Sequence, residues 1–200
     1  MYKSDEFIFC IFSYNRYLYL TNLIDSIRLF YPENKVIIYD DDSDCVLLLD
    51  FYKKLKQDLK FKVVMTNNSI KKIKHGGLYE MMNLALKQAY NTNFKYIFFI
   101  QDDLQFLQYI NLSEWCDKTF KKWNNTFMIS PLFFQKIYSP HINEYIEKKK
   151  GDFLFKNYGV ADIGIIYLER AKKIGLKFDN KGEKHNGNNY YKKNHQLIFS

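Results

Sequence analysis

The sequence predicts an α/β domain with a mostly parallel sheet flanked by helices, on the strength of two observations. Short apolar runs alternate with segments of helical spacing through the first half of the 200-residue chain, and this alternation is typical of parallel strands joined by crossover helices. Phe and Tyr are also frequent, with 18 and 17 residues, whereas disordered chains are poor in aromatic residues. We therefore expect a single domain over residues 1–200.

The first strand and helix are predicted from the pattern that begins at residue 7. The run 7–14 is apolar and rich in Phe and Ile, as buried strands are. Apolar residues then recur at helical spacing, namely Leu20, Leu23, Ile24 and Ile27. Tyr31-Pro32 closes this helix, because proline cannot continue it. Asn15 precedes the helix and is its candidate N-cap, since asparagine is favoured there.

The next elements repeat the same order. The run 35–39 is a second strand that ends on acidic residues, a helix follows across 45–58, and 61–65 is a third strand. A further helix is predicted from the apolar face Leu78, Met81, Met82, Ala85 and Ala89. A fourth strand begins at Lys95 and stops abruptly on Asp102 and Asp103.

The second half of the chain has a less regular pattern. Helices are predicted at 112–123 and 168–174. Strands are predicted at 127–134, 153–155 and 160–167. The tail from Lys181 onward is rich in Lys, Asn and Gly and shows little core-forming pattern.

Composition excludes several classes of protein. No apolar run approaches the roughly 18 to 20 residues that span a bilayer, and the first residues lack the pattern of a signal peptide. The three cysteines are widely spaced and form no C-x-x-C pair, which disfavours a disulfide framework or a structural zinc site. We therefore expect a cytoplasmic protein. The net charge of +8 is mostly lysine and attracts phosphates, nucleic acids and anionic lipids, so peripheral contact with the cytoplasmic face of a membrane is a further expectation.

Polar residues follow three of the predicted strands. In an open parallel sheet, ligands bind beyond the carboxyl ends of the strands. The residues at these ends are Ser13, Tyr14, Asn15 and Arg16, then Asp40, Asp41 and Asp42, then Asp102 and Asp103. Paired carboxylates suit Mg²⁺ or Mn²⁺ together with substrate phosphates, and an exposed tyrosine suits stacking on a base. The alternative is an ordinary acidic turn. Neither the G-x-G-x-x-G motif after the first strand nor a P-loop is present.

In their order and spacing, these motifs resemble the nucleotide-sugar glycosyltransferases of the GT-A fold, a Rossmann-like fold, and in particular the family-two-like members. The motifs are Ser13-Tyr14-Asn15-Arg16, Asp40-Asp41-Asp42-Ser43, Met81-Met82-Asn83 and Gln101-Asp102-Asp103. The resemblance covers residues 7–103. It implies a nucleotide-binding half over 1–105, and an acceptor half with a C-terminal tail over 106–200. In two departures from the family pattern, Gln101 replaces an Asp and Met82 replaces a helix Arg, whose charge Lys74 or Arg16 would supply.

The resemblance also implies roles for individual residues. Asp41 would contact the base, Asp102 the ribose, and Asp103 a Mn²⁺ or Mg²⁺ ion that bridges the diphosphate. The other nucleotide-binding candidates are Ser13, Tyr14, Asn15, Arg16 and Asn83. Two late histidines, His185 and His195, are candidates for further metal ligands. An inverting transfer needs a carboxylate within reach of the acceptor hydroxyl, and the candidates for this base are Asp162, Glu183 and Asp179.

The expected function is a metal-dependent glycosyltransferase that moves a sugar from a UDP- or GDP-type donor to a glycan or a lipid-linked acceptor. One rival is a nucleotidyltransferase, but the Gly-rich, Arg-containing first loop of that class is absent. Two others are a non-catalytic nucleotide-sugar binder and a Lys-rich module that binds nucleic acid, with nucleic acid the less favoured partner.

Overall fold

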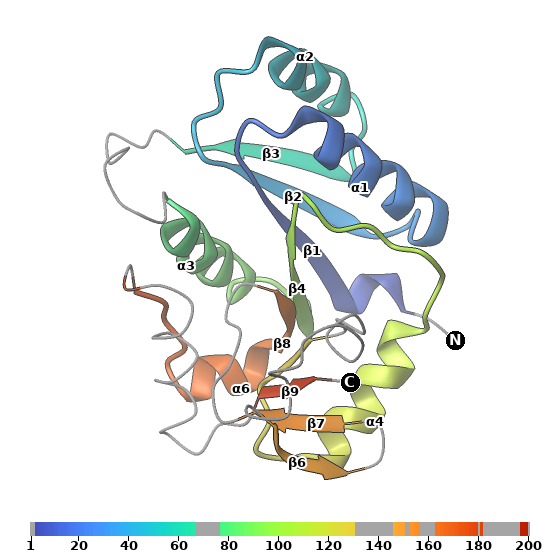
Figure 1. Ribbon diagram of the computed structural model, residues 1–200, viewed down its shortest axis with the longest axis vertical. Helices are drawn as coiled ribbons and strands as arrows, with labels where there is room; N and C mark the ends of the chain where they lie inside the picture. The colour runs from blue at the N-terminus through green and yellow to red at the C-terminus, as the bar shows by residue number, and fades with distance from the viewer. Residues whose placement is uncertain are drawn as a thin grey trace.

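The computed structural model describes residues 3–66, 77–130, 146–150, 153–156, 163–179, 181 and 197–199. The described strands form one sheet in the order β3-β2-β1-β4-β8-β5-β9-β7-β6 (Figure 1). Their bounds are β1 Phe7–Ser13, β2 Lys35–Asp40, β3 Phe61–Met65, β4 Tyr96–Gln101, β5 Met128–Ser130, β6 Ile146–Lys150, β7 Phe153–Lys156, β8 Gly164–Tyr167 and β9 Leu197–Phe199. The helices are η1 Ser4–Glu6, α1 Tyr17–Phe30, α2 Val46–Leu55, α3 Leu78–Ala89, α4 Leu112–Lys122 and α6 Leu168–Lys173.

The four strands of the first half are parallel and end at one edge of the sheet. β1 lies between β2 and β4, and the register pairs Ser13 with Asp40 and Phe12 with Gln101. β3 extends this parallel group on the outer side of β2. β8 runs antiparallel to β4, with Gly164 opposite Phe99, so β8 starts near the edge at which β4 ends. The α/β class and the mostly parallel first half of the sheet are confirmed.

Helices cover both faces of the sheet, and β1 is therefore buried along all seven of its residues. Alternate side chains of β1 pack into two cores. One core lies towards α1, α2 and α4 and includes Phe7, Phe9 and Ile11. The other core lies towards α3 and α6 and includes Ile8, Cys10 and Phe12. Figure 1 shows α1 and α2 on one side of these strands and α3 on the other. A strand buried on both faces has an uninterrupted apolar sequence, which is why the run was recognisable.

The N-cap predicted for the first helix is wrong. Arg16 occupies that position, and no side-chain hydrogen bond caps α1. Asn15 has a positive φ of 54°, and its Oδ1 accepts hydrogen bonds from the backbone N–H groups of Asp44 and Cys45, both at 3.0 Å. Its amide therefore satisfies donors at the start of α2 and links the β1–α1 turn to the β2–α2 turn.

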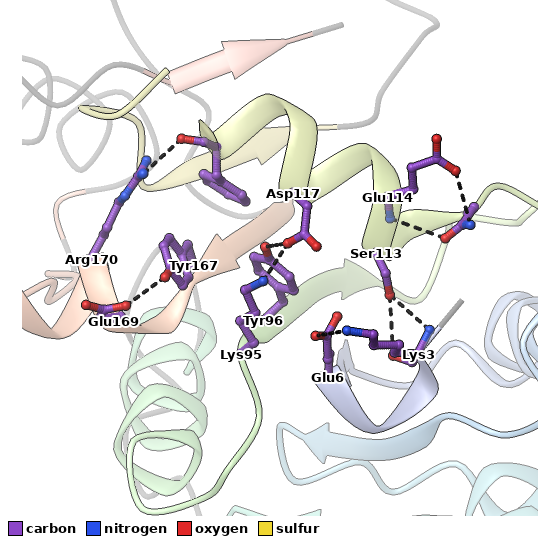
Figure 2. A network of polar contacts seen from close by, with 12 residues as sticks. Lys3, Glu6, Lys95, Tyr96, Ser113, Glu114, Asp117, Tyr167, Glu169 and Arg170 are labelled. Carbon is purple, nitrogen blue, oxygen red and sulfur yellow. Dashed lines mark hydrogen bonds and ion pairs between the residues drawn. The ribbon is translucent and has the colours of Figure 1, made fainter. Parts of the chain in front are cut away.

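A network of polar contacts holds α4 and α6 against the sheet (Figure 2). Asp117 on α4 accepts hydrogen bonds from the Lys95 ammonium and, at 2.7 Å, from the Tyr96 hydroxyl. Arg170 on α6 donates to three backbone carbonyls at or just beyond the end of α4, those of Phe120, Trp123 and Thr126. Burial and the Asp117 hydrogen bond together raise the pKa of Tyr96, which therefore stays protonated as a donor.

The second half follows the predictions only in part of its length. β5 matches the start of the predicted strand 127–134, and β8 matches the end of the predicted strand 160–167. Residues 131–145 and 157–162 lie outside the described residues. α6 matches the helix predicted at 168–174, and the chain turns after it at Gly175, whose φ of +63° suits glycine. In the described part of the chain, no helix is both long and apolar enough to cross a membrane.

Candidate functional site

The polar residues predicted to gather at one sheet edge do so around the end of β1. The backbone N–H of Asp41 donates to the Ser13 carbonyl at 2.9 Å, and the N–H of Asp102 donates to the Phe12 carbonyl at 3.2 Å. The residues that follow β2 and β4 therefore lie on either side of those that follow β1. The arrangement comes from the parallel register of the three strands.

Asp102 and Asp103 share one cation, the guanidinium of Arg16. Its Nη1 lies 3.3 Å from Asp102 Oδ1 and 2.8 Å from Asp103 Oδ2. The Asp102 side chain is 5% exposed, whereas those of Asp103 and Arg16 are 42% and 49% exposed. Burial raises the pKa of Asp102, while the Ser13 hydroxyl and the Arg16 charge act in the opposite direction. The negative charge of Asp102 in turn raises the pKa of Arg16.

Tyr14 stands beside this pair with an exposed ring. Its backbone N–H donates to Asp102 Oδ2 at 3.4 Å, and the residue is 49% exposed. An aromatic ring fixed at its backbone and open on one face is suited to stack on a nucleoside base.

The acidic cluster after β2 divides into a buried and an accessible carboxylate. Asp40 is fully buried. It accepts hydrogen bonds from the Ser43 N–H, the Ser43 hydroxyl and the Tyr52 hydroxyl, each at 2.7 Å. Asp41 is half-buried, and its Oδ2 accepts the N–H of Gly77 at 2.8 Å, just before α3 begins. Asp40 thus holds the turn, and Asp41 faces the start of α3.

Sequence reasoning missed the contribution of Tyr52 to this turn. It lies on α2, where its burial matches the apolar spacing of the helix, and nothing in that spacing points to Asp40. Burial, followed by the charge of Asp40, raises the pKa of Tyr52 and keeps its hydroxyl a donor.

The two predicted asparagines have their amides engaged within the protein. Asn15 binds the start of α2, as described above, and its Nδ2 also donates to Asp44 Oδ1 at 2.8 Å. Asn83 on α3 pairs with the backbone of Phe178: its Nδ2 donates to the carbonyl at 2.8 Å and its Oδ1 accepts the N–H at 2.9 Å. Both amides position segments around the site.

Of the candidate bases, Asp179 is the one in the described part of the chain. It is half-buried and follows Phe178, which Asn83 ties to α3. Its Oδ1 accepts the N–H of Lys181 at 2.9 Å. The remaining candidate bases and metal ligands, Asp162, Glu183, His185 and His195, lie outside the described residues, as does Lys74.

A divalent cation has two candidate ligands here. Within the described ranges, no group of three or more His, Cys, Asp or Glu side chains is arranged to hold a metal ion. The Asp102–Asp103 pair nevertheless fits Mg²⁺ or Mn²⁺, because these ions are often bound through one or two carboxylates and complete their coordination with substrate phosphates and water. The exposed carboxylate of Asp103 is the better placed of the two.

Comparisons with known proteins agree with this geometry. The family model described as glycosyl transferase family 2 matches residues 8–125. A search of curated proteins returned no match to the sequence. Among solved structures, S. aureus TarS 1-349 in complex with UDP has a TM-score of 0.65 at 16% identity, and the match covers 98% of this chain and 57% of that one.

Two further structures combine the same fold with a bound metal. The mannosyltransferase PcManGT from Pyrobaculum calidifontis, in complex with GDP-Man and Mn²⁺, has a TM-score of 0.65 at 11% identity, covering 98% of this chain and 54% of that one. GalNAc-T7 with UDP, GalNAc and Mn²⁺ has a TM-score of 0.62 at 13% identity, covering 96% and 42%. At these identities the likeness concerns the fold, and the chain spans little more than half the length of TarS 1-349 and PcManGT.

Proposed function

The chain belongs to glycosyl transferase family 2 and has a GT-A-type fold, and on this premise we propose that it transfers a sugar from a nucleoside-diphosphate donor to an acceptor hydroxyl. The observation that carries the proposal is the grouping of Tyr14, Asp41 and the Asp102–Asp103 pair around the end of β1. It combines an exposed ring, a hydrogen-bond acceptor and a paired anion within one sheet edge.

We assign the donor to this edge as follows. The ring of Tyr14 stacks on the base, Asp41 accepts a hydrogen bond from a base N–H, and Asp102 accepts one from the ribose. Ser13 and Arg16 line the same turn, while Asn15 and Asn83 hold their segments in place. The UDP bound to TarS and the GDP-Man bound to PcManGT support a donor of the UDP or GDP type.

The diphosphate would be held through a Mn²⁺ or Mg²⁺ ion at Asp103, with His185 and His195 proposed as further ligands. The Mn²⁺ in the PcManGT and GalNAc-T7 structures supports this assignment. When bound, the ion supplies positive charge that stabilises the diphosphate as it departs, which is often a large catalytic contribution. Asp103 contributes by fixing that charge at the rim of the sheet.

The acceptor hydroxyl requires a base, and Asp162, Glu183 and Asp179 remain our candidates. Asp179 is supported by the two hydrogen bonds that hold the adjacent Phe178 on α3, because a general base must be held within reach of the proton that it removes. We propose a glycan or a lipid-linked acceptor, bound by the half of the chain over 106–200, with the donor bound over 1–105.

We further propose a cytoplasmic location, with peripheral contact at the membrane surface when the acceptor is lipid-linked. The three cysteines are free thiols, as expected in a reducing compartment. The positive net charge of +8 favours contact with anionic headgroups.

The proposal is tested with a panel of UDP- and GDP-linked sugars, measuring release of the nucleoside diphosphate with Mn²⁺ and with chelator. Turnover of one donor with Mn²⁺, lost with chelator, is the expected result. Binding of a donor without any turnover, even with glycan acceptors present, would identify a nucleotide-sugar binder instead. Failure of every donor to bind would overturn the proposal.

A further inference from the structure

Arg16 occupies the place at which a cation would bind Asp102 and Asp103. One nitrogen, Nη1, contacts both carboxylates, at 3.3 Å and 2.8 Å. We infer that Arg16 is an exchangeable counter-ion: it neutralises the carboxylate pair in the donor-free protein, and it moves to the diphosphate when a divalent cation takes its place. The inference rests on the proposed function, and it adds a role for Arg16 that links metal binding to donor binding.

Electrostatics explains why the pair needs a resident cation. Asp102 and Asp103 are adjacent, and the Asp102 side chain is only 5% exposed, so solvent screens its charge poorly. Two neighbouring carboxylates that are both ionised repel each other unless a positive charge lies between them. The shared contact through Nη1 provides that charge.

The same geometry makes the guanidinium and a divalent cation competitors. Both are positive, and both bind the inner carboxylate oxygens, so simultaneous occupation would place like charges within a few ångström of each other. A cation that arrives without a nucleotide must therefore displace Arg16 and leave its charge without a partner. Metal binding alone is weakened by this cost.

The donor removes that cost by offering Arg16 a new partner. Arg16 lies in the turn between Tyr14, which we assign to the base, and Asp103, which we assign to the metal. A diphosphate that joins base to metal therefore passes beside it. The side chain is 49% exposed and has room to rotate, and guanidinium groups bind phosphate oxygens strongly. Metal and diphosphate should consequently strengthen each other's binding, as reciprocal linkage requires.

The experiment measures Mn²⁺ binding from the signal of free Mn²⁺ in electron paramagnetic resonance, and diphosphate binding by calorimetry. Wild type is compared with Arg16→Gln, Arg16→Lys and the control Arg28→Gln. Arg28 lies at the other end of α1, is 46% exposed and also pairs with two aspartates, Asp25 and Asp58. Far-UV circular dichroism of each variant verifies that it is folded.

Opposite changes are expected in Arg16→Gln. Mn²⁺ alone should bind about fivefold more tightly, since a partly exposed ion pair no longer competes. UDP or GDP, whichever wild type prefers, should bind about tenfold more weakly with saturating Mn²⁺, since a charged hydrogen bond is lost. Arg16→Lys should stay near wild type in both measurements, and Arg28→Gln should match wild type.

Unchanged or weaker Mn²⁺ binding in Arg16→Gln, with normal diphosphate binding by wild type, would overturn the exchange and leave the proposed function standing. Equal changes in Arg28→Gln would also overturn it, because the effect would then come from net charge. Wild type that binds neither diphosphate with Mn²⁺ would overturn the proposed function, and this inference with it.

Discussion

The side-chain amide of Asn83 pairs with the backbone of Phe178, 95 positions away in the chain, through hydrogen bonds of 2.8 Å and 2.9 Å. Asn83 lies on α3, whose first turn also meets Asp41 through Gly77. Phe178 directly precedes Asp179. One amide thus joins the proposed donor side of the molecule to the segment that carries a candidate base.

Asn83→Ala should reduce both stability and sugar transfer. The variant leaves the N–H and carbonyl of Phe178 without their partner, which costs about 1–3 kcal/mol. Because the Asp179 segment loses its anchor, transfer to acceptor should fall more than hydrolysis of the donor by water. Urea unfolding measures the first effect, and the ratio of transfer to hydrolysis measures the second. Asn91→Ala is the control, since Asn91 donates to the Lys87 carbonyl at an exposed position. An unchanged ratio would show that Asn83 is purely structural.

Asp40 and Asp41 should give opposite results although they are neighbours. Asp40→Ala removes the acceptor of three hydrogen bonds in a buried turn, so unfolding should become easier by at least about 3 kcal/mol. Asp41→Ala loses one contact, with Gly77, and should cost about 1 kcal/mol or less while weakening nucleotide binding about tenfold. Urea unfolding and calorimetry measure the two quantities. If Asp41→Ala binds nucleotide normally, Asp41 is not the base contact.

The contrast between these two residues marks the limit of what sequence predicts here. The strands were predictable because β1, β2 and β4 are apolar runs with few or no exposed residues, and their parallel order brings the following polar residues to one edge. Which acid is buried depends on the hydroxyl of Tyr52, on a different element. A run of aspartates carries no local signal that separates them.

Asn15 and Asn83 were predicted to bind nucleotide for a similar reason. Each is polar and lies in the predicted region, but each amide finds its partner elsewhere in the chain: α2 for Asn15 and Phe178 for Asn83. Arg16 is the reverse case. Its charge was expected near the nucleotide, and its contact with both carboxylates needed the positions of two loops. Contacts between distant segments therefore account for most of what sequence reasoning left open.

The Asp117 network should make stability depend on pH in the acid range. Burial acts to raise the pKa of Asp117, but hydrogen bonds from Lys95 and Tyr96 prevail and hold it below its ordinary value of 3.8. A folded pKa below the unfolded one contributes stability that is present above that ordinary value and is lost as the pH falls through the folded pKa. Asp117→Asn should therefore cost up to about 1 kcal/mol at neutral pH, a modest value because the side chain is 46% exposed.

Urea unfolding of wild type and Asp117→Asn at about pH 7 and about pH 3 measures this difference, which should shrink at the lower pH as wild-type Asp117 becomes protonated. Asp5→Asn, at an exposed position in η1, should show no such pH dependence. A difference that stays constant across the range would mean that packing, not charge, is responsible.

Asp103→Asn should separate catalysis from folding. The change removes the charge and keeps the shape, so turnover should fall about 100-fold or more if Asp103 fixes the cation on the diphosphate. Stability should change by less than about 1 kcal/mol, because the ion pair with Arg16 is half-exposed. Asp50→Asn is the matched control, since Asp50 is an exposed carboxylate paired with Lys53 on α2. Full activity in Asp103→Asn would contradict the metal assignment.

Ligand binding should appear directly as a rise in melting temperature. A ligand that binds only the folded protein stabilises it by about 2.7 kcal/mol at a hundredfold excess over its dissociation constant, and each kcal/mol moves the midpoint by roughly 2–4 °C for a chain of this size. Saturating UDP or GDP with Mn²⁺ should therefore raise the midpoint by several degrees. The shift should largely vanish with chelator or in Asp103→Asn, because the diphosphate then meets the carboxylates without the cation. A shift of equal size with and without Mn²⁺ would instead point to attraction by lysines alone, and raising the salt concentration would then abolish it.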